Sequence, residues 1–125
     1  MSALLWVALG GSLGAVARYG AGQLIRSTLP YISWPVATLT VNVLGSLGIG
    51  IIFILLERHH VHDAARLVLL VGFLGGFTTF STFSLELLLM MERGDWALAM
   101  GYAFVSLVSC FAGVYLGAQL ARSFG

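Results

Sequence analysis

The sequence predicts an all-α integral membrane protein that forms one domain, residues 1–125, and crosses the bilayer four times. Hydrophobic residues make up 59% of the chain and charged residues only 9%, and the mean hydropathy is +0.99. A soluble domain carries roughly 25% charged residues, so lipid is the expected solvent. A bilayer-spanning helix needs about 20 mainly apolar residues. Such stretches lie at about residues 4–26, 34–56, 65–91 and 96–121, with short loops between them.

The first span, residues 4–26, is expected to remain in the mature chain. A secretory signal peptide carries its positive residues before the apolar run, whereas here Arg18 comes late and no charge precedes it. Gly10 and Gly14 form a GxxxG pair, a spacing that lets helix backbones approach closely in lipid. We therefore expect this span to pack tightly against another helix.

The second and fourth spans each carry a polar stripe. Helix residues four apart lie on one face, and asparagine inside a membrane is costly unless it is paired. Amide and hydroxyl groups are neutral donors of the kind that an anion path needs. Hydrogen bonding between helices is the alternative, but two stripes together favour a permeation path. Their members are Thr38, Asn42 and Ser46 in the second span and Tyr102, Ser106 and Cys110 in the fourth.

The third span contains the most unusual stretch of the chain. Between Gly72 and Ser84, paired glycines are followed by threonines, which lowers helix propensity. We expect a break in mid-membrane, where non-helical backbone must be buried in protein or line a wet cavity. Exposed carbonyls there could hold a cation. A continuous helix with glycine contacts is the alternative.

Phe80 and Phe83 are three residues apart, so they share one face if the helix resumes after the break, and Phe77 extends the row. Phenylalanine rows usually face lipid or pack in a core. An aromatic ring has a positive edge, however. Two rings presented edge-on could therefore lie beside an anion without offering it a competing charge.

The distribution of arginine leaves the orientation undecided. With four spans, one side carries Arg58, Arg66 and Arg122. The other side carries Arg26 and Arg93. Three against two is almost no bias under the positive-inside rule, which favours insertion in both orientations as an antiparallel homodimer. The alternative is that five charges carry no topological signal. A net charge of +1 gives no footprint for nucleic acid.

Arg18 is the only basic residue well inside a predicted span, and Glu86 the only acidic one. Each is a functional candidate because an intramembrane charge is expensive. They could pair with each other or with carbonyls, or Arg18 could reach a vestibule where it attracts anions. The residues alone do not choose between these roles.

No enzyme is predicted. His59, His60 and His62 lie in the loop after the second span and form no regular zinc motif, so a solvated loop is favoured. The single cysteine, Cys110, lies in an apolar segment and cannot form an intrachain disulfide. Nucleophilic catalysis is disfavoured because the histidines are far from it along the chain.

Three blocks make the sequence similar to the Fluc (CrcB) family of fluoride channels. The blocks are GGSLGAVARY at 10–19, TLTVNVLGS at 38–46 and GFLGGFTTFSTFS at 72–84. They occur in family order, the third is highly specific, and the resemblance covers the whole chain. It implies a passive, fluoride-selective channel that exports fluoride across the bacterial inner membrane, with no organic cofactor and no energy source.

The resemblance also implies an antiparallel, dual-topology homodimer embedded in membrane lipid, with two pores that are each lined by both chains. Phe80 and Phe83 match the phenylalanine box whose ring edges face fluoride, and Asn42 matches the pore asparagine. Gly75 and Thr78 match positions whose carbonyls, from both subunits, hold a structural sodium ion (Na+) at the dimer interface. No sodium transport follows.

Thr38, Tyr102 and Ser106 match the polar track that continues the pore, and Arg18 matches the family's basic residue, which we expect in a vestibule. A buried arginine at the narrowest point would bind fluoride too tightly for release. Cys110 departs from the pattern, because relatives usually carry a hydroxyl residue there and a thiol donates weakly. If Cys110 lines the pore, conduction should be altered or become sensitive to thiol reagents.

Two other classes share the four-span format. A proton-coupled exporter like the small multidrug resistance proteins needs a carboxylate in the first span, where this chain has Arg18 and no acidic residue. A non-transporting membrane subunit would leave the Asn42 stripe and the broken span without a purpose. Flux measurements in liposomes separate all three.

Overall fold

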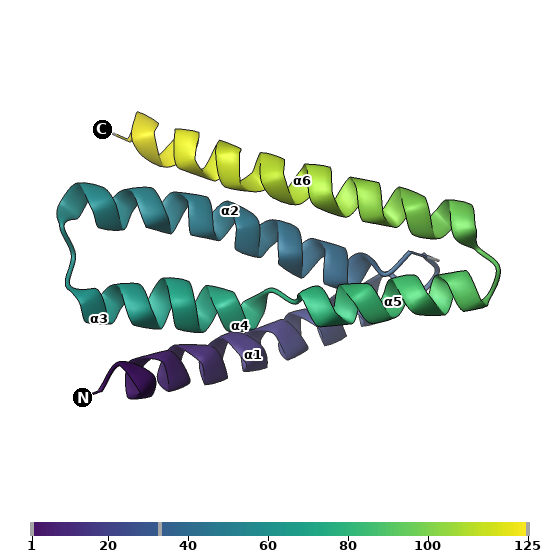
Figure 1. The fold of residues 1–125 in the computed structure, drawn as a ribbon, viewed down its shortest axis with the longest axis horizontal. Coiled ribbons are helices and arrows are strands. Elements are labelled where there is room, and N and C mark those ends of the chain that lie inside the picture. The colour runs from purple at the N-terminus through teal and green to yellow at the C-terminus, as the bar shows by residue number, and fades with distance from the viewer. Residues whose placement is uncertain (1, 33, 125) are drawn as a thin grey trace.

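The computed structural model describes residues 2–32 and 34–124, which are helical with short connections and contain no strand. Four stretches are long and apolar enough to cross a membrane, and they lie side by side (Figure 1). They are Ala3–Thr28, Val36–His59, Asp63–Glu92 and Trp96–Ser123. The predicted all-helical fold with four spans is confirmed, and the largest boundary difference is at the end of the second span, residue 56 against His59.

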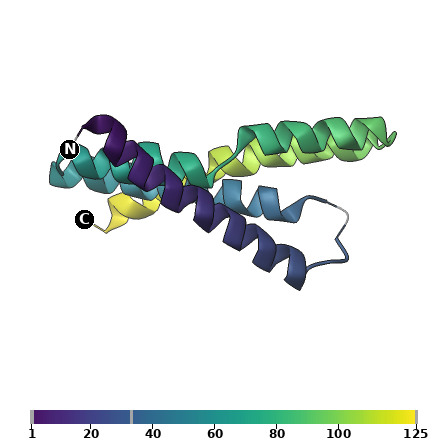
Figure 2. The same cartoon turned by 90° about the horizontal axis from the view of Figure 1, so that it is seen from below.

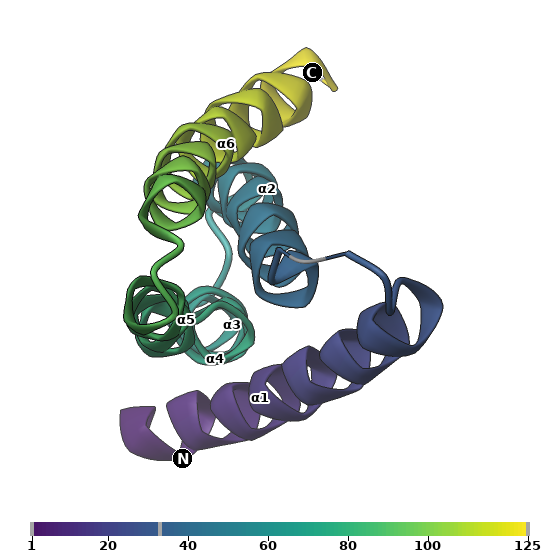
Figure 3. The ribbon, with the colours of Figure 1, turned by 90° about the vertical axis from the view of Figure 1, so that its right-hand side faces the viewer.

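Three of the spans are single helices and the third is composite. The continuous helices are α1 (Ala3–Thr28), α2 (Val36–His59) and α6 (Trp96–Ser123). The third span consists of α3 (Asp63–Arg66), the π-helix η1 (Leu67–Leu74), α4 (Gly75–Phe77) and α5 (Phe80–Glu92). α2 packs chiefly on α6, and α1 packs chiefly on η1, as the end-on view in Figure 3 shows.

Glycines set the closest helix contacts. A Cβ atom on Gly10 or Gly14 would collide with the backbone of η1, at the carbonyl oxygens of Val68 and Phe73. A Cβ on Gly117 in α6 would collide with the α2 backbone in the same way. There is little hydrophobic drive between helices in lipid, so the van der Waals contacts made at such close approach hold the helices together. The predicted GxxxG face of Gly10 and Gly14 therefore packs within the chain, and so does Gly117.

The two halves of the bundle separate beyond the break in the third span. Figure 2 shows α5 and the beginning of α6 diverging from the end of α1 and the beginning of α2. The other end is tied together, since the Arg58 guanidinium on α2 donates to the carbonyl oxygens of Ala121 and Arg122 at 3.3 and 3.4 Å. The polar groups that the sequence singles out lie around the break.

Candidate anion-binding site at the helix break

Two residues of extended backbone separate α4 from α5. Thr78 has φ −88° and ψ 158°, and Thr79 has φ −148° and ψ 119°. These are ordinary β-region values, so a β-branched residue adopts them without strain. Thr79 also starts the next helix, because its Oγ1 accepts a hydrogen bond from the Thr82 N–H at 3.2 Å, as an N-cap does. The sequence signal for a poor helix thus coincides with the interruption.

Asn42 on α2 forms hydrogen bonds to both the N–H and the carbonyl of Thr79 in the interrupted backbone. Its Oδ1 accepts from the Thr79 N–H at 2.7 Å, and its Nδ2 donates to the Thr79 carbonyl oxygen at 3.1 Å. Thr79 is only 8% exposed, so water could not replace these bonds easily. An amide has two N–H donors, and the Thr79 carbonyl takes one of them.

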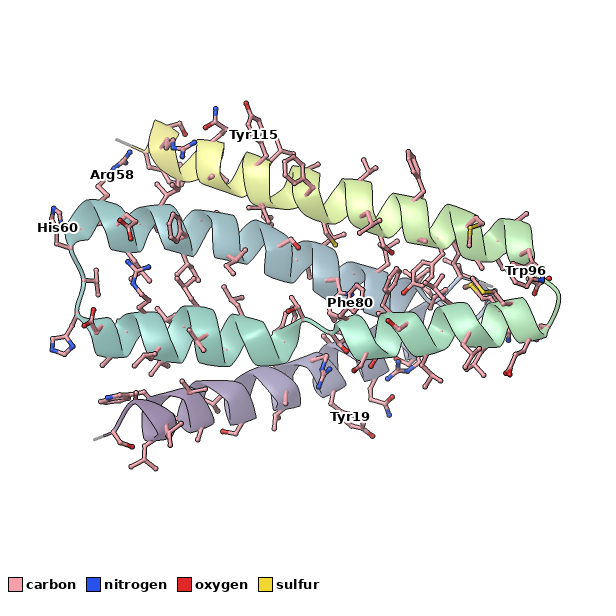
Figure 4. The ribbon with its side chains drawn as sticks, in the orientation of Figure 1. Tyr19, Arg58, His60, Phe80, Trp96 and Tyr115 are labelled. Atoms are coloured by element: carbon pink, nitrogen blue, oxygen red, sulfur yellow. The ribbon has the colours of Figure 1, made fainter. Side chains whose placement is uncertain are left out.

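A cavity of about 470 Å³ lies beside the break and is lined by residues of α2, η1, α4, α5 and α6. Phe80 and Phe83 form part of its wall, with ring centroids 5.5 Å apart and planes tilted by 48°. Phe83 is 7% exposed and Phe80 is 73% exposed. Figure 4 shows Phe80 immediately after the break. Polar members of the wall are Asn42, Ser46, Thr78, Thr79, Ser106 and Cys110.

Ser106 contributes an unusual group to this wall. Its side chain is buried, and its Oγ has no hydrogen-bond partner in the described part of the chain. Buried polar atoms in native proteins are nearly always paired. The wall of the cavity therefore includes a residue whose buried hydroxyl has no hydrogen-bond partner among the described residues.

Phe77 does not extend the row of Phe80 and Phe83. It stacks on Phe73 instead, with centroids 6.0 Å apart and planes within 7°. The two extended residues between Phe77 and Phe80 end the helical periodicity on which the predicted row depended. The aromatic pair at the cavity is Phe80 with Phe83.

Two residues of the predicted polar track, Thr38 and Tyr102, form hydrogen bonds to the same carboxylate. The Thr38 hydroxyl donates to Glu86 Oε2 at 2.7 Å, and the Tyr102 hydroxyl donates to Glu86 Oε1 at 2.8 Å. Tyr102 is fully buried, and its ring lies 5.1 Å from that of Phe83. Sequence reasoning left Glu86 without a role. Its spacing of three residues from Phe83, which puts both on one face of α5, is the signal that could have placed it there.

Arg18 lines a second cavity, of about 240 Å³, whose wall also includes Thr79. Arg26, Thr38 and Thr82 also line it. Among the described residues the ion pairs are Arg66 with Glu57 and Arg93 with Asp95, so Arg18 does not pair with Glu86. This placement agrees with the vestibule alternative rather than the ion-pair alternative.

The break changes the hydrogen bonding of two carbonyls. In a continuous helix the Gly75 carbonyl would accept from the Thr79 N–H, and the Thr78 carbonyl from the Thr82 N–H. The first N–H donates to Asn42 and the second to Thr79 Oγ1. Both carbonyl oxygens are therefore released from the helical ladder. Unwound carbonyls of this kind coordinate Na+ in membrane proteins, so the donor set fits the predicted ion.

The three histidines lie at exposed positions at the end of α2 and just after it. No group of three or more His, Cys, Asp or Glu side chains that could hold a metal is present in residues 2–32 and 34–124. His62 has a local role, since its Nδ1 accepts from the Ala64 N–H at the start of α3. The interpretation as a solvated loop agrees with its exposure.

The fold and site define a multi-pass α-helical membrane protein with a neutral polar site at a helix break. The chain belongs to the CrcB family, since residues 5–118 match the family described as "CrcB-like protein, Camphor Resistance (CrcB)". The resemblance seen in the sequence is confirmed.

Similar proteins extend over the whole length of the chain. A protein of Magnetococcus marinus is 45% identical over 95% of this chain and 97% of its own length. One of Shewanella sp. strain ANA-3 is 46% identical over 98% of both. One of Chloroflexus aurantiacus is 40% identical over 100% of this chain and 99% of its own length. Each is named a fluoride-specific ion channel, which is a transport protein and not an enzyme.

Proposed function

We propose that this protein is a passive, fluoride-selective channel that exports fluoride from the cytoplasm. The observation that carries the proposal is the cavity at the break, where the Phe80 and Phe83 rings lie with Asn42 and the unpartnered Ser106 hydroxyl. Full-length relatives named as fluoride-specific ion channels support the choice of ion. No organic cofactor or chemical step is required.

The chemistry of this wall suits a small, strongly hydrated anion. The Ser106 O–H and the second N–H of Asn42 are neutral donors, and the aromatic edges of Phe80 and Phe83 add weak positive potential. Neutral donors can replace water around fluoride without trapping it, whereas conduction fails if an ion binds too strongly to leave. A narrow, fixed constriction would exclude the larger chloride ion. Arg18 and Arg26 at the second cavity would concentrate anions at a vestibule.

The working unit in this proposal is an antiparallel homodimer with two pores. Phe80 lies in the cavity wall and is nevertheless 73% exposed in one chain, so a second copy would complete the wall. The nearly balanced arginines allow insertion in both orientations. The carbonyls of Gly75 and Thr78, in both subunits, would hold a structural Na+ between the copies; Gly75 is exposed, as such an interface requires.

Fluoride efflux from proteoliposomes tests the proposal. Vesicles loaded with potassium fluoride and held near zero potential by valinomycin should release fluoride rapidly through the wild-type protein, and vesicles loaded with chloride should not release chloride. Phe80→Ile and Asn42→Ala should slow the efflux. Phe104→Ile is the matched control, because Phe104 is exposed on α6 and lines neither cavity.

The same vesicles separate the rival classes. A channel releases fluoride whether or not a proton gradient is present, whereas a proton-coupled exporter slows when a protonophore collapses the gradient. No release by the wild type, or equal release of fluoride and chloride, would contradict the proposal. Equal effects of Phe104→Ile and Phe80→Ile would contradict the assignment of the site.

A further inference from the structure

Two arginine side chains of α1 border the second cavity, and neither is paired with a carboxylate. Arg18 is half-buried and Arg26, about two turns later, is exposed; both line the cavity of about 240 Å³. Neither belongs to the ion pairs found in residues 2–32 and 34–124, and the described wall of this cavity contains no acidic residue. Cationic groups within a membrane span are costly without a partner, so we expect an anion at this cavity.

The Arg26 side chain is turned back along the helix toward Arg18. Its Nη2 atom lies 3.0 Å from the place that a Cβ atom on Gly22 would occupy, and Gly22 is one turn before Arg26 and one turn after Arg18. Gln23 fixes this position, because its Oε1 accepts from Arg26 Nε at 3.3 Å and from Nη2 at 2.9 Å. The glycine thus leaves room for the second guanidinium at the cavity.

We propose that Arg18 and Arg26 form a binding site for a phosphate group, and that an occupied site slows fluoride passage. The second part rests on the proposed function, because it requires this cavity to be a vestibule of the conducting path. Arginine is suited to phosphate because its planar fork of N–H groups matches two phosphate oxygens at once. At roughly 30 Å³ per water molecule, the cavity has room for the few heavy atoms of a phosphate group.

The wall keeps donors available for such a ligand. Arg26 directs its Nε–H and one Nη2–H to Gln23, and the other N–H groups of its guanidinium remain. Thr82 accepts from the Thr79 hydroxyl at 3.1 Å, so its own hydroxyl hydrogen can be donated into the cavity that it lines. A dianionic phosphate can contact both guanidinium groups together, whereas a halide has one charge and one centre. The site should therefore prefer phosphate to chloride.

Glu86 does not neutralise the two arginines. It borders a third cavity, of about 430 Å³, together with Arg26. Its two carboxylate oxygens accept from the Thr38 and Tyr102 hydroxyls at 2.7 and 2.8 Å, and it forms no ion pair with Arg26 in the described part of the chain. One carboxylate beside two guanidinium groups leaves a net positive charge for a ligand.

A bound phosphate would act on fluoride through its charge and its position. Thr79 lines both this cavity and the cavity of Phe80 and Phe83, so the site adjoins the proposed path. Without a ligand, the positive charge raises the local concentration of fluoride. A bound dianion would cancel that attraction and repel fluoride at the entrance.

Binding is tested on the purified protein in a neutral detergent without lipid, with inorganic phosphate as the probe. The thermal midpoint is measured in sodium phosphate and in sodium chloride at equal Na+ concentration, with choline chloride added to match the ionic strength. Phosphate also stabilises proteins generally through exclusion from their surface, so variants are needed. Arg18→Gln and Arg26→Gln each remove one guanidinium. Arg93→Gln is the matched control, because Arg93 is exposed and lines none of the three cavities.

We expect phosphate to raise the midpoint of the wild type and of Arg93→Gln by about 2 °C or more over that of Arg18→Gln and Arg26→Gln, because a ligand stabilises the state that binds it. In vesicles with phosphate on both sides, wild-type fluoride efflux should fall about twofold when half of the sites are filled. Arg26→Gln, relative to its own rate without phosphate, should keep its efflux.

A second arm identifies the source of the phosphate group. The protein is taken from vesicles that contain phosphatidylglycerol into gentle detergent and analysed by native mass spectrometry. A phosphatidylglycerol molecule retained by the wild type and lost from Arg26→Gln would support the site with a lipid headgroup as its ligand. A phosphate shift without retained lipid would support the site with free phosphate as its ligand.

Equal midpoint shifts for the wild type and Arg26→Gln would overturn the site, and so would an equal loss of the shift in Arg93→Gln. Unchanged wild-type efflux at a phosphate concentration that raises the midpoint would overturn the slowing. If the wild type releases no fluoride even without phosphate, the proposed function fails. The midpoint measurement still decides the phosphate site in that case, because it needs no flux.

Discussion

Replacing Asn42 by alanine should destabilise the folded protein as well as slow fluoride efflux. The amide makes hydrogen bonds of 2.7 and 3.1 Å to the Thr79 N–H and carbonyl, and Thr79 is 8% exposed. Interhelical hydrogen bonds in membrane proteins average about 0.6 kcal/mol and reach about 1.7 kcal/mol. Two of them therefore contribute roughly 1–3 kcal/mol, toward the upper end because Asn42→Ala leaves both backbone groups of Thr79 unpaired.

The loss can be measured as the free energy of unfolding in mixed dodecyl maltoside and sodium dodecyl sulfate micelles, followed by tryptophan fluorescence. Ser46→Ala is the matched control, since Ser46 lies one turn further along α2 in the same cavity wall and makes no hydrogen bond to Thr79. It should change stability by less than about 0.5 kcal/mol. If Asn42→Ala lost fluoride efflux at unchanged stability, the amide would act on the ion and not on the backbone, and the reasoning would be refuted.

Three further predictions follow from the same geometry. Glu86→Ala should lower the free energy of unfolding by about 1–3 kcal/mol, because it removes the acceptor of two buried hydroxyls. Glu86→Gln should lower it less, and equal free energies of unfolding for the two variants would contradict this. Gly14→Ala should cost about 1–3 kcal/mol through its collision with the η1 backbone, whereas Gly20→Ala, which meets no atom within 4 Å, should be neutral or stabilising in the same measurement. Replacing Na+ by N-methyl-D-glucamine should lower the thermal midpoint of the detergent-solubilised dimer, and an unchanged midpoint would count against the proposed sodium site.

The number and extent of the spans could be predicted because each depends on local composition. An apolar run of about 20 residues must form its hydrogen bonds internally in lipid, and this requirement fixes it as a helix. The GxxxG pair of Gly10 and Gly14 predicted a packing face, because small residues let helix backbones approach closely. Sequence did not show which helix each face meets: Gly14 contacts η1, whereas Gly117 contacts α2.

The hydrogen bonds of Asn42 and Glu86 were only partly predictable, because they depend on which helix faces pack against one another. Asn42 was recognisable as an expensive residue in need of a partner. That its partner is the backbone of Thr79, 37 positions away, requires the three-dimensional arrangement. The same holds for Glu86, which joins Thr38 and Tyr102 from two other helices.

A single side chain connects the proposed pore wall to the proposed dimer interface. Asn42 takes the Thr79 N–H that would otherwise bond the Gly75 carbonyl, so the same hydrogen bond frees an acceptor that the proposed Na+ would use. Thr79 repeats the exchange one turn later, because its hydroxyl takes the Thr82 N–H and frees the Thr78 carbonyl. The break therefore leaves neither the Thr79 N–H nor the Thr82 N–H unpaired, and it frees two carbonyls for the proposed Na+. A proline in place of Thr79 would also interrupt the helix, but it would lack the N–H that Asn42 holds, which explains why a threonine and an asparagine together suit this position.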